Sequence, residues 1–218
     1  MDILLIRHGE TAWNRERRMQ GHIDIPLNEA GLRQARALGV ALAAERPDAI
    51  WSSDLQRARD TAKAIANVHQ MPVQYSEALR ERCYGAFEGM TYQDIGKRYP
   101  IEMKQWQARD EHARFPAGDR EAETLHEFHQ RCMTAVTSIA STHHGQKLVI
   151  VAHGGVLDCL YRAATGMPLN VERHFSIVNA AINRLHWNGE QLSLRQWGDD
   201  AHLTAAGLDE IDRTHPAA

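Results

Sequence analysis

The fold is decided by residues 148–155, which read Leu148-Val149-Ile150-Val151-Ala152-His153-Gly154-Gly155. A run of five apolar residues is typical of a strand that is buried on both faces of a sheet. The helical pattern over 156–165 follows at once, so the segment predicts a strand that turns sharply into a helix. In open α/β sheets, ligands bind beyond the carboxyl ends of the strands, so we expect His153 to lie at a binding site.

The rest of the chain alternates between short apolar runs and helical patterns, which is typical of an α/β protein. We expect a hairpin where 181–187 and 191–197 flank Asn188-Gly189, a strong two-residue turn signal. The other predicted strands span 3–6, 49–52 and 73–75, and the predicted helices span 28–46, 55–68, 121–142 and 156–165.

The organisation along the chain favours one domain over 1–218. Residues from about 84 to 118 mix aromatic, glycine and charged residues without a strong strand pattern, which indicates a cap insertion of short helices over a site. The tail over about 198–218 is polar, and we expect it to be partly loose.

Composition excludes several classes of protein. The 218 residues carry 25 Lys and Arg against 28 Asp and Glu, a net charge of −3, so no strongly basic nucleic-acid surface is expected. No apolar run approaches the ~18 residues that a membrane span needs, and the first residues do not resemble a signal peptide. The three cysteines are widely spaced without a metal-binding pattern, which indicates a reduced, cytoplasmic protein.

Cationic and imidazole side chains follow three of the predicted strands. Arg7 and His8 come after the first strand, Arg57 after the second, and His153 after the strand at 148–152. Arginine offers a planar fork of donors that fits phosphate oxygens, and a neutral imidazole can act as a nucleophile. These residues therefore predict a phosphate pocket at one edge of the sheet.

The same residues resemble a known family. The run Arg7-His8-Gly9-Glu10-Thr11, followed by Trp13-Asn14, is similar to the opening motif of the histidine phosphatase superfamily, which contains cofactor-dependent phosphoglycerate mutases and many phosphomonoesterases. The resemblance continues in the family's order from residue 3 to about residue 187, through Gln20-Gly21, 52–58, Leu79-Arg80-Glu81, 85–89 and 151–155. It implies a three-layer α/β sandwich with a mostly parallel central sheet, helices on both faces and a small helical cap insertion.

The resemblance also implies the catalytic roles. His8 would be the nucleophile that takes the phosphoryl group as a phosphohistidine. Arg7, Arg57 and His153 would bind the phosphoryl oxygens and stabilise the transition state. Glu81 would protonate the leaving oxygen, and the phosphate charge beside it would favour the acid form. Phosphoryl transfer needs mainly positioning and charge neutralisation, which these cations supply without a metal or a cofactor.

Several residues keep alternative interpretations. Asn14 either donates to the phosphate or caps a turn, and Glu10 and Glu88 are acids that compete with Glu81 for the general-acid role. Trp106 either lines the substrate cavity or packs the cap, while His126 and His129 share a helical face without a third metal ligand. The implied substrate-binding residues are Arg7, Asn14, Gln20, Gly21, Arg57 and Gly154.

The resemblance implies a metal-independent phosphomonoesterase acting on a small phosphorylated metabolite, with a cofactor-dependent phosphoglycerate mutase as the alternative. A binding module that has lost catalysis is disfavoured because the catalytic set is intact. Cofactor-dependent phosphoglycerate mutases carry an adjacent pair of arginines in the stretch after the general acid. After Glu81, this chain has only the scattered Arg98, Arg109 and Arg114 in that stretch. The run Arg82-Cys83-Tyr84-Gly85 is more similar to the mutases than to the phosphatases. The sequence does not assign a role to Glu123. A homodimer is compatible with these residues, which do not fix the oligomeric state.

Overall fold

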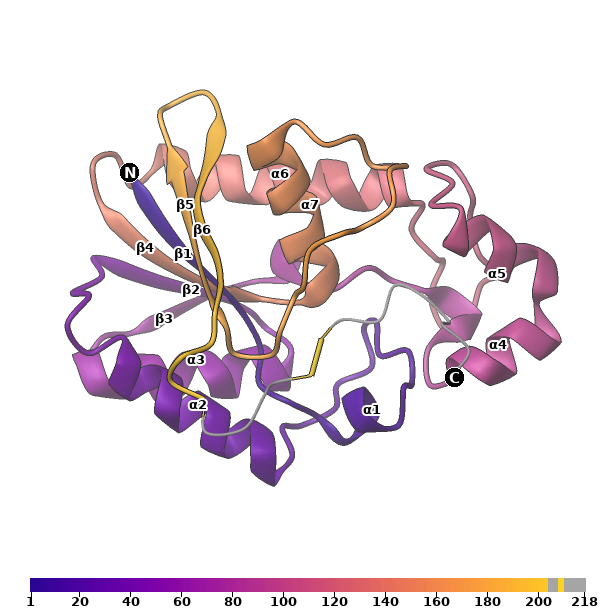
Figure 1. Cartoon of the computed structure of the whole chain (residues 1–218), viewed down its shortest axis with the longest axis horizontal. Helices are drawn as coiled ribbons and strands as arrows, with labels where there is room; N and C mark the ends of the chain where they lie inside the picture. The colour runs from indigo at the N-terminus through magenta and orange to yellow at the C-terminus, as the bar shows by residue number, and fades with distance from the viewer. Residues whose placement is uncertain (204–207, 210–218) are drawn as a thin grey trace.

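One sheet with the strand order β3-β2-β4-β1-β5-β6 runs through the computed structural model, which describes residues 1–203 and 208–209 (Figure 1). Strands β1 to β4 run parallel, whereas β5 pairs antiparallel with β1 and β6 pairs antiparallel with β5. The sheet is thus mostly parallel, and the predicted hairpin at Asn188-Gly189 is confirmed. The strand bounds are β1 (Asp2–Arg7), β2 (Ala49–Ser53), β3 (Val73–Ser76), β4 (Lys147–Ala152), β5 (Ile182–Trp187) and β6 (Leu192–Asp199).

Helices cover both faces of this sheet (Figure 1). Successive side chains of a strand point to opposite faces, and both faces of β1 are buried. Leu4 and Ile6 pack in one core cluster with α2 (Glu29–Ala41) and α3 (Gln56–His69). Ile3 and Leu5 pack in the other cluster, with α6 (Leu125–Ser141) and α7 (Gly154–Thr165). The continuous apolar run of β1 therefore reflects a three-layer sandwich, as predicted.

Helix α6 begins four residues later than the sequence pattern predicts. Thr124 is its N-cap, and its hydroxyl accepts a hydrogen bond from the amide of Glu127 while the Glu127 side chain bonds back to the amide of Thr124. This capping box satisfies two of the free amides at the start of the helix and fixes the boundary at Leu125.

The cap consists of η2 (Gly85–Phe87), α4 (Tyr92–Arg98) and α5 (Pro100–Gln107), which pack around their own small apolar cluster. The two ends of this insertion lie against each other, since the Ala86 amide donates to the Pro116 carbonyl at 2.8 Å. Gly85 has a φ of +58°, and a Cβ on it would lie 2.3 Å from the Pro116 carbonyl oxygen, so only glycine fits at this entry to the cap. The remaining short elements are α1 (Ala12–Arg15) and η1 (Glu77–Leu79).

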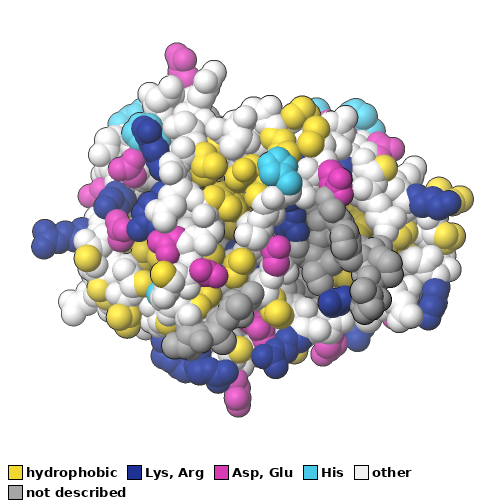
Figure 2. Space-filling model, in the orientation of Figure 1, with side chains coloured by type: hydrophobic (Ala, Val, Ile, Leu, Met, Phe, Trp, Pro, Cys, Tyr) yellow, Lys and Arg dark blue, Asp and Glu magenta, His cyan; other side chains and the backbone are white. Residues whose placement is uncertain are grey.

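The expected loose tail lies partly outside the described residues, at 204–207 and 210–218. In the described part of the chain, no helix is both long enough and apolar enough to cross a membrane. On the face shown in Figure 2, basic and acidic side chains are interspersed, in keeping with the small net charge.

Candidate active site

The ends of β1 and β4 bring His8 and His153 together. The two strands are parallel neighbours in which Arg7 pairs with Ala152, so the next residue of each strand lies at the same edge of the sheet. The His8 amide donates to the Ala152 carbonyl at 3.0 Å, and the two imidazole rings lie 5.2 Å apart with an interplanar angle of 60°. Both side chains are buried.

The structure fixes which nitrogen of His8 can act as a nucleophile. Its Nδ1 lies 2.7 Å from the Gly9 carbonyl oxygen. A carbonyl oxygen only accepts hydrogen bonds, so Nδ1 carries the proton and Nε2 keeps its lone pair. Burial, together with the charges of Arg57 and Arg7, holds the pKa of His8 well below its ordinary value of 6.5. The imidazole is therefore neutral near pH 7.

Two buried arginines stand beside this imidazole. Arg57 donates from Nη1 to the Ile23 carbonyl at 2.9 Å and from Nη2 to the Gly21 carbonyl at 2.7 Å. Arg7 donates from Nη1 to the carbonyl of Ile177 at 2.7 Å. These backbone acceptors orient the two guanidinium groups at the end of the sheet, and a planar guanidinium can bind an anion with two donors.

His153 precedes α7 as its N-cap residue. Neither of its ring nitrogens has a hydrogen-bond partner among the residues that the structure describes. Burial, followed by the charges of Arg57 and His8, keeps the pKa of His153 well below 6.5. A buried imidazole with two unused nitrogens can donate to or accept from a ligand that enters the site.

Glu81 is held by backbone amides on both carboxyl oxygens. Its Oε1 accepts from the Arg82 amide at 2.8 Å, and its Oε2 accepts from the Gly155 amide at 3.0 Å. A Cβ on residue 155 would lie 2.2 Å from Glu81 Oε1, so glycine is required for this approach. The carboxyl group is thereby fixed beside the start of α7, close to His153.

The two competing acids are occupied elsewhere. Glu10 Oε1 accepts from Arg15 Nε at 2.5 Å and from Asn28 Nδ2 at 2.7 Å. Glu88 Oε1 accepts from the amides of His22 and Tyr84, both at 3.0 Å. Neither Glu10 nor Glu88 lines the phosphate pocket, whereas Glu81 does, which favours Glu81 for the acid role.

Glu123 lies behind the acid and forms a salt bridge with Arg131. Burial alone would raise the pKa of Glu123, but the hydrogen bonds and charge of Arg131 outweigh burial and lower it. Arg131 Nε and Nη2 donate to the two oxygens of Glu123 at 2.7 Å each, and Arg131 Nη2 also donates to the Glu81 carbonyl at 3.0 Å. The pair therefore positions the Glu81 segment, which answers the open question about Glu123.

The phosphate pocket brings most of the predicted residues together. Asn14 caps a turn, because its Oδ1 accepts from the Thr11 amide at 2.9 Å in a capping box. Asn14 also lines the pocket, and its donation to a phosphate stays a prediction. Gln20 Oε1 accepts from Thr11 Oγ1 at 3.1 Å. Gly154 lines a neighbouring cavity instead, and His153 lies against His8. The predicted residues that line the phosphate pocket are Arg7, His8, Asn14, Gln20, Gly21, Arg57 and Glu81.

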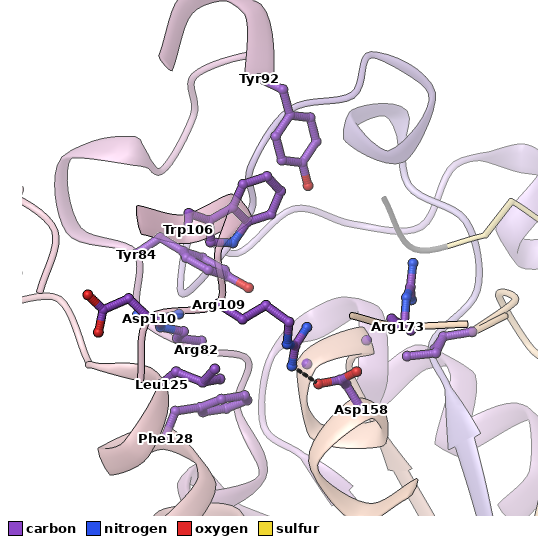
Figure 3. A pocket seen from close by; sticks show the side chains of 13 residues that line it. Arg82, Tyr84, Tyr92, Trp106, Arg109, Asp110, Leu125, Phe128, Asp158 and Arg173 are labelled. Carbon is purple, nitrogen blue, oxygen red and sulfur yellow. Dashed lines mark hydrogen bonds and ion pairs between the residues drawn. The ribbon is translucent and has the colours of Figure 1, made fainter. Parts of the chain in front are cut away.

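A second cavity adjoins this pocket beneath the cap (Figure 3). Sequence analysis missed four of its charged residues, namely Arg82, Asp110, Asp158 and Arg173. The only sequence signal for Arg82 was its position directly after Glu81. Trp106 has both of its alternative roles, since its ring stacks on Tyr92 of the cap and also lines the cavity.

The family model of the histidine phosphatase superfamily (branch 1) matches residues 3–200. The chain belongs to this superfamily. Its relatives include Phosphoglycerate mutase-like protein 4 of Arabidopsis thaliana, 36% identical over 95% of this chain and 89% of that protein. Another is a metal-independent phosphoserine phosphatase of the same plant, 35% identical over 95% of this chain and 85% of that protein.

Solved structures of the histidine phosphatase superfamily have the same fold. Bacillus stearothermophilus YhfR superposes with a TM-score of 0.85 at 35% sequence identity, covering 93% of this chain and 98% of that one. The relatives thus include both phosphatases and mutase-like proteins, and a phosphatase or mutase-like enzyme is the class that they support.

The described residues also bear on metal binding. Over residues 1–203 and 208–209, no group of three or more His, Cys, Asp or Glu side chains could hold a metal ion. His126 faces His112, with the ring centroids 5.5 Å apart.

Proposed function

We propose that the protein is a metal-independent phosphomonoesterase that works through a phosphohistidine on His8. The observation that carries this proposal is the tautomer of His8: its Nδ1 proton is held by the Gly9 carbonyl, and its Nε2 lone pair is unprotonated in a pocket with two buried arginines. A neutral nucleophile beside fixed cations is what in-line attack on a phosphate dianion requires.

In the first step, His8 Nε2 attacks phosphorus, the N–P bond forms and the bond from phosphorus to the ester oxygen breaks. The carboxyl proton of Glu81 passes to that oxygen, which leaves as an alcohol. Arg7 and Arg57 neutralise the charge on the equatorial oxygens, and the neutral His153 donates a hydrogen bond to one of them. In the second step, water attacks phosphorus, its proton returns to Glu81, the N–P bond breaks and inorganic phosphate is released.

The positions of the cap arginines favour hydrolysis over the mutase reaction. Arg114 donates to the Ala122 carbonyl and pairs with Glu127, and Arg98 lies 5.4 Å from the Tyr99 ring; neither lines the two cavities. Arg109 reaches the second cavity but is paired with Asp158. Within the described part of the chain, no adjacent pair of arginines beyond Glu81 lines either cavity. The adjacent Arg17 and Arg18, which precede Glu81, do line the phosphate pocket.

The test is release of inorganic phosphate from a panel of phosphomonoesters, with and without excess chelator. Interconversion of 2- and 3-phosphoglycerate in the presence of the bisphosphate is measured in parallel. We expect hydrolysis that survives the chelator and exceeds mutase turnover. Loss of all activity with chelator, restored by one divalent ion, would contradict metal independence. Mutase turnover faster than hydrolysis would assign the alternative function.

The reducing environment expected from the cysteines also belongs to this proposal. Cys83, Cys132 and Cys159 are free and buried in the structure. Their free thiols support a protein that works in a reducing compartment such as the cytoplasm.

A further inference from the structure

The second cavity is the space into which the alcohol part of the substrate must extend. It measures about 610 Å³, counted with the solvent-open space at its mouth, and Tyr84 and Tyr92 line both this cavity and the phosphate pocket. Gly155, which lines it, donates its amide to Glu81 Oε2. A leaving oxygen protonated by Glu81 therefore belongs to a group that lies in this cavity.

One wall of the cavity contains a stacked pair of aromatic rings. Tyr92 and Trp106 stack with their centroids 5.3 Å apart and an interplanar angle of 21°, and both remain only partly buried. The core of the cap has its own stacked pair, Phe87 and Phe115 at 4.6 Å, so the cap does not depend on Trp106 for its centre. In Figure 3, Tyr92 and Trp106 stand on one side of the open space and Arg173 on the opposite side. Aromatic faces of this kind bind unsaturated rings by offset stacking.

The polar groups of the cavity offer both an unused acceptor and an unused donor. Asp158 pairs through Oδ2 with Arg109 and with Arg162 Nε, the latter at 2.9 Å, and its buried Oδ1 has no hydrogen-bond partner among the described residues. Arg82 is only 4% exposed, its Nε donates to the Glu123 carbonyl, and its Nη2 has no hydrogen-bond partner among the described residues. A buried guanidinium with an unused N–H is costly unless a ligand supplies an acceptor. The unused donor of Arg82 therefore favours a ligand group with acceptor atoms.

We propose that the substrate is a phosphomonoester whose leaving group carries an unsaturated ring of nucleobase size with hydrogen-bond acceptors, stacked along Trp106 and Tyr92. Nucleoside 5′-monophosphates represent this class, whereas three-carbon phosphate esters would leave the aromatic wall bare. The inference rests on the proposed function for its placement of the phosphoryl group, but ring binding itself can be measured without turnover.

The experiment compares ligands that differ only in the ring. Ribose 5-phosphate and uridine 5′-monophosphate share the ester and the sugar, and adenosine 5′-monophosphate adds a larger base. Affinities are measured by titration calorimetry on the His8→Ala variant, which cannot form the phosphohistidine. We expect both nucleotides to bind about 10-fold or more tightly than ribose 5-phosphate. Equal affinities, or no binding of either nucleotide in the millimolar range, would overturn the ring inference.

Variants at Trp106 test whether the aromatic wall is responsible. In the same background, Trp106→Leu should remove most of the nucleotide preference while leaving ribose 5-phosphate affinity unchanged, and Trp106→Phe should keep most of it. A nucleotide preference that survives Trp106→Leu in a folded variant would contradict the proposed wall. If wild type hydrolyses ribose 5-phosphate but shows no ring preference, only this inference fails. If the ring preference holds and no phosphomonoester is hydrolysed, the proposed function fails and the ring site stands.

Discussion

Replacing Glu81 by Gln should slow the enzyme in a way that depends on the leaving group. The substitution keeps the side chain's shape but removes the transferable proton. An alkyl phosphate leaves as a basic alkoxide, so its rate of phosphohistidine formation should fall by roughly 10²–10⁴-fold. An aryl ester such as p-nitrophenyl phosphate leaves as a weakly basic phenolate, and we expect it to lose less than about 10-fold.

The structure also sets the cost of this variant in stability. Both carboxyl oxygens of Glu81 accept a backbone amide, at 2.8 and 3.0 Å. A glutamine offers one acceptor oxygen, so its NH₂ group must face the other amide and one buried donor loses its partner. That loss costs about 1–3 kcal/mol, which corresponds to a lower Tm by roughly 2–12 °C for a chain of this size.

Single-turnover rates measured by rapid quench are the suitable assay, because hydrolysis of the intermediate cannot then mask its formation. Glu10→Gln is the matched control, since Glu10 is a buried acid whose side chain bonds to Arg15 and Asn28 and which is not among the described residues that line the phosphate pocket. It should affect both esters alike. Equal losses for the alkyl and the aryl ester in Glu81→Gln would refute the acid role of Glu81.

Two further predictions concern protonation and the glycine beside the acid. Burial and arginine charge lower the pKa of His8 and of His153 in the folded chain. Below about pH 6.5, the unfolded chain therefore binds protons that the folded chain does not. The free energy of unfolding falls as the pH decreases. His153→Gln should remove about 1.4 kcal/mol per pH unit of this slope in denaturant titrations below pH 6; an unchanged slope would contradict the buried neutral imidazole. Gly155→Ala places a methyl group 2.2 Å from Glu81 Oε1 and should slow alkyl esters more than aryl esters, whereas Gly96→Ala, with its nearest neighbour 4.0 Å away, should leave both rates unchanged. Equal rates for Gly155→Ala and wild type would show that this close approach does not position the acid.

Much of the fold could be predicted because its signals are local. The apolar runs at the first strand and at 148–152 are continuous, since both faces of the sheet are covered, and Asn188-Gly189 fixes a hairpin by its turn chemistry. The start of α6 was misplaced because acidic and small residues before Thr124 fit a helix, while the capping box at Thr124 decides the boundary.

The phosphate pocket was predictable for a similar reason. Arg7, His8, Arg57 and His153 each follow a strand, and the parallel topology places strand ends at one edge. No comparable rule predicts from the sequence which residues line the second cavity. Trp106 and Arg173 come from a cap helix and a long loop, and only the packing of the cap against α7 brings them together.

The central claim is that His8 carries the phosphoryl group during turnover. The most direct measurement is to quench the wild-type enzyme in alkali during turnover of a ³²P-labelled phosphomonoester and to map the label by peptide mass spectrometry. We predict acid-labile, alkali-stable phosphate on His8, together with no turnover by a folded His8→Ala variant. Steady hydrolysis without labelled protein, or clear residual activity in that variant, would contradict the covalent mechanism.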